Sequence, residues 1–409
     1  MKGRYLLTLA LCLSPFSVFA EKTIDAGNFV YQGCIRVPVD IEISGLTFYP
    51  SGDPGGPADG YSGSLYVMSS DEKALEMTIP TPSIEVSAGS CPVAAVRQNL
   101  TSVGCNLDSM DGSSRPGGIA YYNDLGGAGE KLYWTIYEYY NVVGVNHDSA
   151  GWMNMDLAGC EGAWGMTGTG GSSDDYHSMK WEDYIFEIHD KQWADTHLDG
   201  RYLLYGKHRE AGCCGSATGP SLYAAAPWED GNPIPNNGNM SGQLLLSYSG
   251  TWDLPNSHYF PALFGDPEYR PTDRWSGAAW IRVGNEDAIV LTGRKSLGPS
   301  SYNDGGNGCN SWWGYHGDPY GARWWFYDPS DLECVIAGTC DSWVPTPYAV
   351  HDPSGEIYND DCFNDVEWQG GAAFDDANDI FYFAESNFTD ISFEPIIHVY
   401  RVRGSQRFD

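Results

Sequence analysis

The chain has 409 residues, with 54 Asp or Glu against 22 Lys or Arg, so its formal net charge at pH 7 is −32. A field of that sign repels nucleic acid and anionic lipid, and no basic stripe offsets it, which excludes nucleic-acid partners. The 50 glycines and 24 prolines, with scarcely any helical periodicity, predict many short strands joined by turns. The one helix that the pattern supports lies near Asp190–Thr196.

The N-terminus has the pattern of a secretory signal peptide. Lys2 and Arg4 precede an apolar run over 5–18, and Val18-Phe19-Ala20 forms a small-x-small cleavage site. Residues 1–20 are therefore predicted to be removed, leaving 21–409 as a single secreted or periplasmic domain. No later apolar run is long enough to span a bilayer.

One strand pattern recurs along the chain: a glycine-led run rich in Ala and aromatic residues is followed, after a turn, by a second apolar run. The clear copies are Gly45–Tyr49 with Ser64–Met68, Gly117–Tyr122 with Lys131–Ile136, Gly277–Ile281 with Ala288–Thr292, and Gly370–Asp375 with Ile380–Glu385. A degenerate fifth copy begins at Gly219. Recurrence of a sheet unit predicts an all-β fold, a β-propeller with five recognisable units and five to seven blades. The alternative is that these runs are inner strands of a β-sandwich.

In a propeller the first strand of each blade lines the central channel, where neighbouring blades crowd together. Gly and Ala fit there, and larger side chains do not. Residues 29–37 are then predicted to form the outer strand that closes the ring against the last blade. That closure pairs the two ends of the chain.

Eleven cysteines are present, and the ten outside the signal peptide predict disulfides in an exported protein. Cys334 with Cys340, and Cys91 with Cys105, are close enough in sequence to close local loops. The adjacent pair Cys213-Cys214 is expected to bond to two different partners, because a ring between neighbours is strained. No Cys-x-x-Cys-His or zinc spacing occurs, so c-type haem and zinc are not expected.

The chain also resembles a family of uncharacterised exported bacterial proteins with propeller-like repeats. The resemblance covers most of the chain from Gly117 on. It rests on four motifs: Thr218–Tyr223 with Pro227–Gly231, Asp273–Gly277, Phe326–Pro329, and Gly370–Phe374. It implies the fold, and it implies no particular activity.

If the second strand of each unit runs antiparallel to the first, its end and the start of the first strand lie on the same face. Basic residues, although few in this chain, gather at those positions: Arg115, Lys207, Arg209, Arg274, Arg294 and Lys295. Trp275 and Trp368 enter the same strands. Arginine beside tryptophan suits an anionic sugar, so we predict a polysaccharide or cell-surface glycan as the partner. The predicted substrate-binding residues are Arg115, Arg274, Arg294, Trp275, Trp368 and His147.

Two catalytic chemistries fit these positions. A polysaccharide lyase needs a cation for the uronate carboxylate and groups that move protons, for which Arg209, His208 and Tyr140 are candidates together with Arg294 and His147. A glycoside hydrolase needs paired carboxylates, for which Glu138 and Glu385 are candidates. The alternatives are that these residues only cap strands and bridge neighbouring units, and that the protein is a non-catalytic glycan- or protein-binding or adhesion module. An electron-transfer enzyme is not favoured without haem or copper ligands.

A structural calcium ion is the one cofactor that the pattern suggests. Asp108 and Asp111 begin a segment with acidic groups spaced as in a calcium loop, followed by Gly112. The distant Glu and the full spacing are absent, so a solvated turn is the competing interpretation. The sequence leaves the oligomeric state open.

Overall fold

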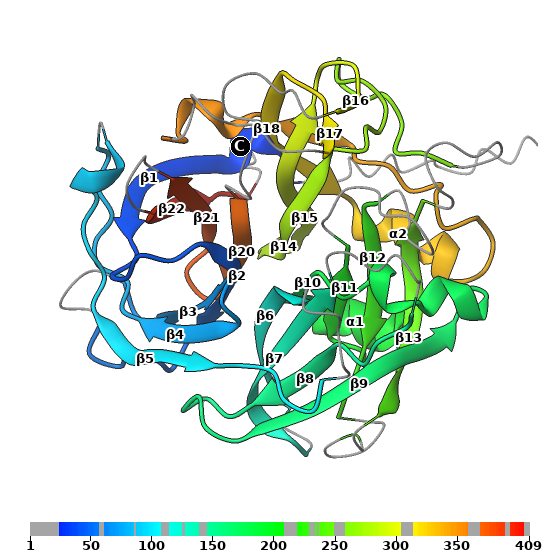
Figure 1. Cartoon of the computed structure of the whole chain (residues 1–409), viewed down its shortest axis with the longest axis horizontal. Coiled ribbons are helices and arrows are strands. Elements are labelled where there is room, and N and C mark those ends of the chain that lie inside the picture. The colour runs from blue at the N-terminus through cyan, green and yellow to red at the C-terminus, as the bar shows by residue number, and fades with distance from the viewer. Residues whose placement is uncertain are drawn as a thin grey trace, which may run out of the picture.

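The computed structural model describes residues 24–56, 61–85, 87–107, 114–124, 127–138, 145–207, 219–228, 234, 237–248, 258–303, 314–358, 369–388 and 393–404 (Figure 1). Its elements are mostly strands, which confirms the predicted β class. The predicted signal peptide lies outside the described residues.

The main strands form five units of four, in which each unit is written from its first to its fourth strand. Unit 1 is β2 (Ile43–Tyr49), β3 (Ser64–Ser69), β4 (Lys73–Met77) and β5 (Val96–Ser102). Unit 2 is β6 (Ser114–Asp124), β7 (Gly129–Glu138), β8 (Ala150–Met153) and β9 (Cys160–Thr169). Unit 3 is β10 (Tyr184–Glu187), β11 (Leu203–Gly206), β12 (Ser221–Ala225) and β13 (Gly238–Ser247). Unit 4 is β14 (Arg274–Val283), β15 (Glu286–Ser296), β18 (Tyr320–Tyr327) and β19 (Ala349–His351). Unit 5 is β20 (Gln369–Asp375), β21 (Ile380–Phe388), β22 (Phe393–Val402) and β1 (Phe29–Arg36).

The smaller elements lie between and beside these strands. A two-stranded hairpin consists of β16 (Ser301–Asn303) and β17 (Gly314–His316). The helices are α1 (Lys191–His197) and α2 (Pro329–Ile336), with 3-10 turns η1 (Ala26–Asn28), η3 (Ala88–Ser90), η4 (Ser173–Tyr176), η5 (Ser178–Lys180) and η6 (Pro353–Gly355). Units 2 and 3 share one eight-stranded sheet, because β9 and β13 pair in parallel at its centre.

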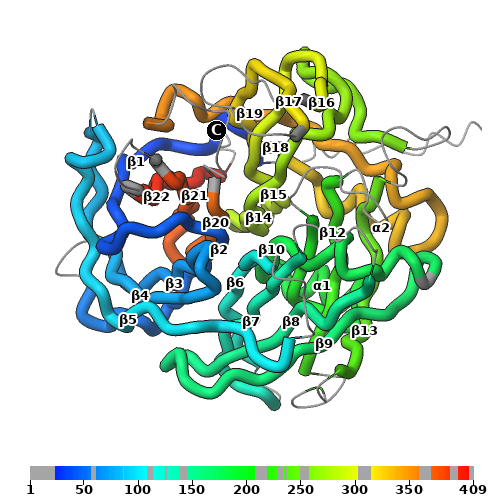
Figure 2. The backbone as a smooth tube through the Cα atoms, viewed as in Figure 1, coloured from blue at the N-terminus to red at the C-terminus, as the bar shows by residue number. Residues whose placement is uncertain are grey.

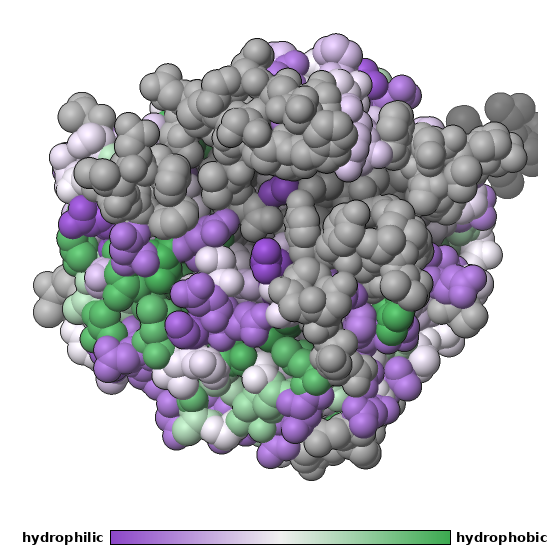
Figure 3. Space-filling model, in the orientation of Figure 1, coloured by the Kyte–Doolittle hydropathy of each residue, from purple (hydrophilic) through white to green (hydrophobic). Residues whose placement is uncertain are grey.

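The first strands of the five units gather in the middle of the molecule, as Figure 2 shows for β2, β6, β10, β14 and β20. They contact one another in the cyclic order β2, β6, β10, β14, β20 and back to β2. The sheets therefore close into a nearly complete ring around one axis. Hydrophilic residues lie around the middle of the face seen in Figure 3, in the region where the first strands meet in Figure 1.

Glycines permit this crowding at the axis. A Cβ atom added to Gly277 would lie 2.5 Å from Cα of Gly371, and one added to Gly45 would lie 2.9 Å from the backbone nitrogen of Ile119. Real Cβ atoms do not approach backbone so closely, so each glycine is required by the first strand of the neighbouring unit. The crowding that was predicted at the glycine-led runs is confirmed.

The ring is closed by the N-terminal strand. β1 pairs antiparallel with β22, from Phe29 opposite Val402 to Arg36 opposite Ile396. The predicted pairing of the two ends of the chain is therefore confirmed. A disulfide from Cys34 in β1 to Cys91 then ties this outer strand to the segment that precedes β5.

One predicted first strand is a third strand in the structure, and one of the two described helices was predicted. The copy at Gly219 leads into β12, the third strand of unit 3, and the first strand of that unit is β10. The glycine-rich stretch between 137 and 176 contains β8 and β9. The helix expected near Asp190–Thr196 is confirmed as α1, whose Asp190 side chain accepts from the Trp193 N–H, but α2 was not predicted. Its signal was the Asp328-Pro329 pair, an N-cap followed by proline at N1.

The described disulfides confirm one predicted pair and correct the other. Cys334 bonds to Cys340 as predicted, and this disulfide links the last turn of α2 to the segment that follows it. Cys91 bonds to Cys34 and Cys105 bonds to Cys160, so the predicted pair Cys91 with Cys105 was wrong. The folding of the strands places Cys91 beside Cys34 and Cys105 beside Cys160, although these partners are more than 50 residues apart in the sequence. Cys213 and Cys214 lie outside the described residues.

Candidate functional site

The predicted face exists, because the first and second strands of every unit are antiparallel. We call this end, where first strands begin and second strands end, the rim. In each unit one residue of the second strand lies opposite the first residue of the first strand. In chain order these five residues are Ser69, Glu138, Gly206, Arg294 and Glu385. Two carboxylates and an arginine thus occupy equivalent positions around one axis.

Ionisable side chains at and beside these positions are buried. Each of the following is less than a tenth exposed: Glu138, His147, Glu182, Asp183, Lys207, Asp273, Arg274, Arg294, Lys295, Glu385 and His398. Removing charges from water is costly even when they are paired, and apolar residues of similar volume are often as stabilising. Such a concentration of buried charge at one end of the axis is typical of a functional site.

In unit 2 the rim carboxylate holds a histidine. Nε2 of His147 donates to Oε2 of Glu138 across 2.8 Å. The backbone N–H of His147 donates to Oγ of Ser178, and its carbonyl accepts from Oγ of Ser149. Within the described part of the chain, the buried Nδ1 of His147 has no hydrogen-bond partner. A carboxylate therefore orients a buried histidine whose second nitrogen makes no hydrogen bond within the described residues.

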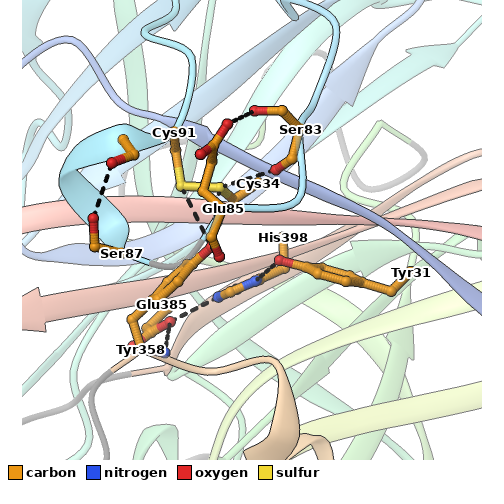
Figure 4. The surroundings of a disulfide bond; sticks show 10 residues. Tyr31, Cys34, Ser83, Glu85, Ser87, Cys91, Tyr358, Glu385 and His398 are labelled. Atoms are coloured by element: carbon orange, nitrogen blue, oxygen red, sulfur yellow. Dashed lines mark hydrogen bonds and ion pairs between the residues drawn. A yellow bond between two sulfur atoms is a disulfide. The ribbon is translucent and has the colours of Figure 1, made fainter.

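In unit 5 the equivalent carboxylate belongs to a chain of hydrogen bonds that crosses the sheet (Figure 4). Nε2 of His398 lies 2.7 Å from Oε2 of Glu385, and the hydroxyl of Tyr31 lies 3.0 Å from Nδ1 of His398. The backbone N–H of Tyr358 donates to the same Glu385 oxygen. Burial raises the pKa of Tyr31 well above its ordinary value, so its hydroxyl stays protonated and donates to the histidine. Unlike His147, His398 has both ring nitrogens engaged.

In unit 4 the rim holds an ion pair. Nζ of Lys295 lies 2.6 Å from Oδ2 of Asp273, and both side chains are fully buried. Burial raises the pKa of Asp273 and lowers the pKa of Lys295, and the ion pair opposes both shifts. Beside them Nε of Arg294 donates to the carbonyl of Thr272, and its guanidinium lies over the ring of Tyr320.

The structure brings together part of the predicted site. Glu138 with His147, Arg274 with Arg294, and Glu385 lie at the rim. Arg115 is exposed there. Trp275 was expected to stack on a sugar, but it is fully buried in the apolar core between units 3 and 4, so that role is wrong. The predicted residues Tyr140, His208, Arg209, Trp368, Asp108 and Asp111 lie outside the described residues.

A cavity at the opposite end of the axis was not predicted. It has a volume of about 320 Å³, and all five first strands line it. Its aromatic wall consists of Phe48, Tyr121, Tyr122, Trp280 and Phe374. The signal in the sequence was the aromatic residue near the end of each first strand.

Trp280 of this cavity is held by a carboxylate with a shifted pKa. Its Nε1 donates to Oδ1 of Asp287, and burial raises the pKa of Asp287 to about 6. The pKa of this carboxyl is higher in the folded state than in the unfolded chain, so the folded state binds the proton more tightly. Its contribution to the free energy of unfolding therefore falls as the pH rises from about 4 to about 6.

We therefore expect Asp287→Asn to be more stable than the wild type at pH 7, by about 1–3 kcal/mol, and to show no such advantage at pH 4. Urea unfolding at the two pH values measures this difference. Asp199→Asn, which changes a carboxylate that is 95% exposed, is the control and should show no pH-dependent difference. An equal effect of Asp287→Asn at both pH values would contradict the prediction.

Within the described ranges, no helix combines the length and apolar character needed to cross a membrane. The same residues contain no group of three or more His, Cys, Asp or Glu side chains placed to hold a metal ion. No protein-family model matches the chain, and no curated protein matches it.

Proposed function

We propose that the protein is an exported five-bladed β-propeller that cleaves an anionic polysaccharide by elimination at the rim, with His147 transferring the proton. The cyclic contacts of the five first strands, the four-stranded units around them and closure by β1 support the propeller assignment. The predicted signal peptide and the even number of cysteines outside it support export.

One observation carries the reaction: the buried pair of Glu138 and His147, in which only Nε2 of the histidine is used. A carboxylate that accepts from one imidazole nitrogen orients the ring, so that the other nitrogen can act as a general base. In elimination from a uronic acid that base removes the proton on C5. A double bond then forms between C4 and C5, and the bond from C4 to the glycosidic oxygen breaks. The protonated histidine gives the same proton to that oxygen, which leaves as a hydroxyl, and His147 returns to its neutral form.

The arginines of the rim support the proposal that the substrate is anionic. Arg274 and Arg294 lie opposite each other in β14 and β15, in a chain whose overall charge is −32. Guanidinium groups bind carboxylates through charge-assisted hydrogen bonds, and neutralising the uronate carboxylate makes its neighbouring proton more acidic. This requirement distinguishes elimination from a site built only to hold neutral sugars.

Hydrolysis by Glu138 and Glu385 receives less support. Oε2 of Glu138 accepts from His147, and Oε2 of Glu385 accepts from His398 and from the Tyr358 backbone. Both carboxylates therefore already orient neighbouring groups. A general acid and a nucleophile need access to the sugar instead.

We expect His147→Gln to lower turnover of a uronate-containing polysaccharide by about 100-fold or more, since general acid–base catalysis contributes about 10²–10⁴-fold. The assay follows the absorbance of unsaturated uronate and new reducing ends on the purified mature protein. His398→Gln is the matched control, because it also removes a buried histidine from a rim glutamate but leaves His147 in place.

Reducing ends without absorbance, lost in Glu138→Gln and Glu385→Gln, would replace elimination by hydrolysis. Equal loss of activity in the two histidine variants, at unchanged melting temperature, would refute the role of His147. Binding of glycan with no turnover would favour the second candidate function, a glycan-binding or adhesion module.

A further inference from the structure

The cavity at the end of the axis opposite the rim is large enough for a small molecule. Its volume of about 320 Å³ is at the lower limit of the usual range for ligand pockets. It is lined by the ends of the first strands, whereas the rim is formed by their beginnings. A ligand bound here would not contact the rim residues, so this cavity is a separate site.

The inside of the cavity is apolar. Aliphatic side chains line it, from Leu46, Ile119, Ile185, Ala279 and Ala372, together with the aromatic wall described above. The polar group of Tyr121 is already used, because its hydroxyl donates to Glu130. A flat apolar or aromatic body would bury its surface against these residues.

The mouth of the cavity is polar, and its charges are unequal. Lys191 donates to Oε1 of Glu187 and to the carbonyl of Ile188, each across 2.6 Å, so the lysine and glutamate charges offset each other. Burial lowers the pKa of His189 to about 4, which leaves it uncharged at neutral pH. Asp376 is exposed and contributes a negative charge at this end. The charge that remains at the mouth is therefore negative.

The charge of the whole chain acts in the same direction. A net charge of −32 raises the local concentration of cations and lowers that of anions. From the apolar interior, the aromatic wall and the acidic mouth, we propose that this cavity binds a small organic cation with an aromatic or apolar body, of the size of an arylalkylamine. The aromatic rings also favour such a ligand, because their faces attract cations.

Three probes with the same body and different charge test this proposal: phenethylamine, 2-phenylethanol and phenylacetate. Binding to the full mature protein at pH 7 is measured by titration calorimetry and by ligand-observed NMR. We expect phenethylamine to bind at least tenfold more tightly than phenylacetate, with 2-phenylethanol between them. Added salt should reduce the differences in affinity among the three probes, because it screens the charges.

Two exposed positions allow the site to be changed without touching the core. Ala377→Trp places a large side chain at the mouth and should weaken phenethylamine binding at least tenfold, whereas Ala158→Trp, at an exposed alanine that does not line the cavity, should not. Asp376→Asn should remove most of the preference for the amine over the alcohol, and Asp174→Asn, at an exposed acid that does not line the cavity, should leave it. Absence of binding by all three probes, binding unchanged in Ala377→Trp, or a preference for phenylacetate would each overturn the proposal. None of these outcomes bears on polysaccharide cleavage at the rim.

Discussion

Lys295→Met should destabilise the protein by about 3–5 kcal/mol, the usual cost of breaking a buried ion pair by removing one partner. The side chains of Lys295 and Asp273 are fully buried, and their charged atoms lie 2.6 Å apart. Methionine fills most of the volume of the lysine stem but leaves the Asp273 carboxylate buried without its cation. Urea unfolding of the mature protein at pH 7 measures the loss.

The double variant Asp273→Asn/Lys295→Met separates charge from packing. The asparagine oxygen can still accept from the Ser296 backbone N–H, as one Asp273 oxygen does now. We expect this double variant to regain more than half of the loss, since no buried charge remains. The deficit of Lys295→Met alone should also shrink at pH 4, because a buried carboxyl without its cation binds a proton readily. A loss under 1 kcal/mol in Lys295→Met would contradict the complete burial of the Lys295–Asp273 ion pair.

Replacing Cys34 and Cys91 by serine should cost about 4 kcal/mol of folding free energy. The disulfide links residues 57 apart, and the loop-entropy relation gives about that value for a loop of this length. It also fastens β1, the strand that closes the ring by pairing with β22. Loss of this bridge should therefore weaken the closure of the whole molecule.

The matched control is the pair Cys334→Ser/Cys340→Ser, whose bridge spans only 6 residues. The same relation gives about 2 kcal/mol for that short loop. Denaturant unfolding without reductant should thus show the long bridge to be worth about 2 kcal/mol more than the short one. Equal losses would mean that loop length does not determine how much the Cys34–Cys91 bridge stabilises the protein. Strain in the bridge or contacts in the unfolded chain would then determine it.

Much of the fold followed from local pattern. Glycine-led runs at Gly45, Gly118, Gly277 and Gly371 predicted first strands, because only glycine fits where a Cβ atom would lie within about 3 Å of a neighbouring backbone. The closure by β1 followed from an unassigned strand near the N-terminus. Unit 3 was misassigned because its first strand, β10, carries no glycine and the Gly219 motif belongs to a third strand.

The candidate site could be predicted only in part. Antiparallel pairing implied the rim, and it placed Glu138, Arg294 and Glu385 at one end. The partners of these residues were not foreseen, since His398 and Tyr31 reach Glu385 from two further strands of the sheet. Trp275 looked like a ligand platform in sequence but lies in the core, because residue type alone does not distinguish a buried ring from an exposed one.

The sequence by itself determined the β class, the recurring strand pairs, the crowding at the axis and the single predicted face. These depend on steric limits and strand periodicity, which act over a few residues. Only the tertiary structure decided which cysteines pair, which charges at the rim form pairs, and that the ends of five first strands enclose a cavity. Those features depend on distances between units far apart in the chain, and no local pattern encodes such distances.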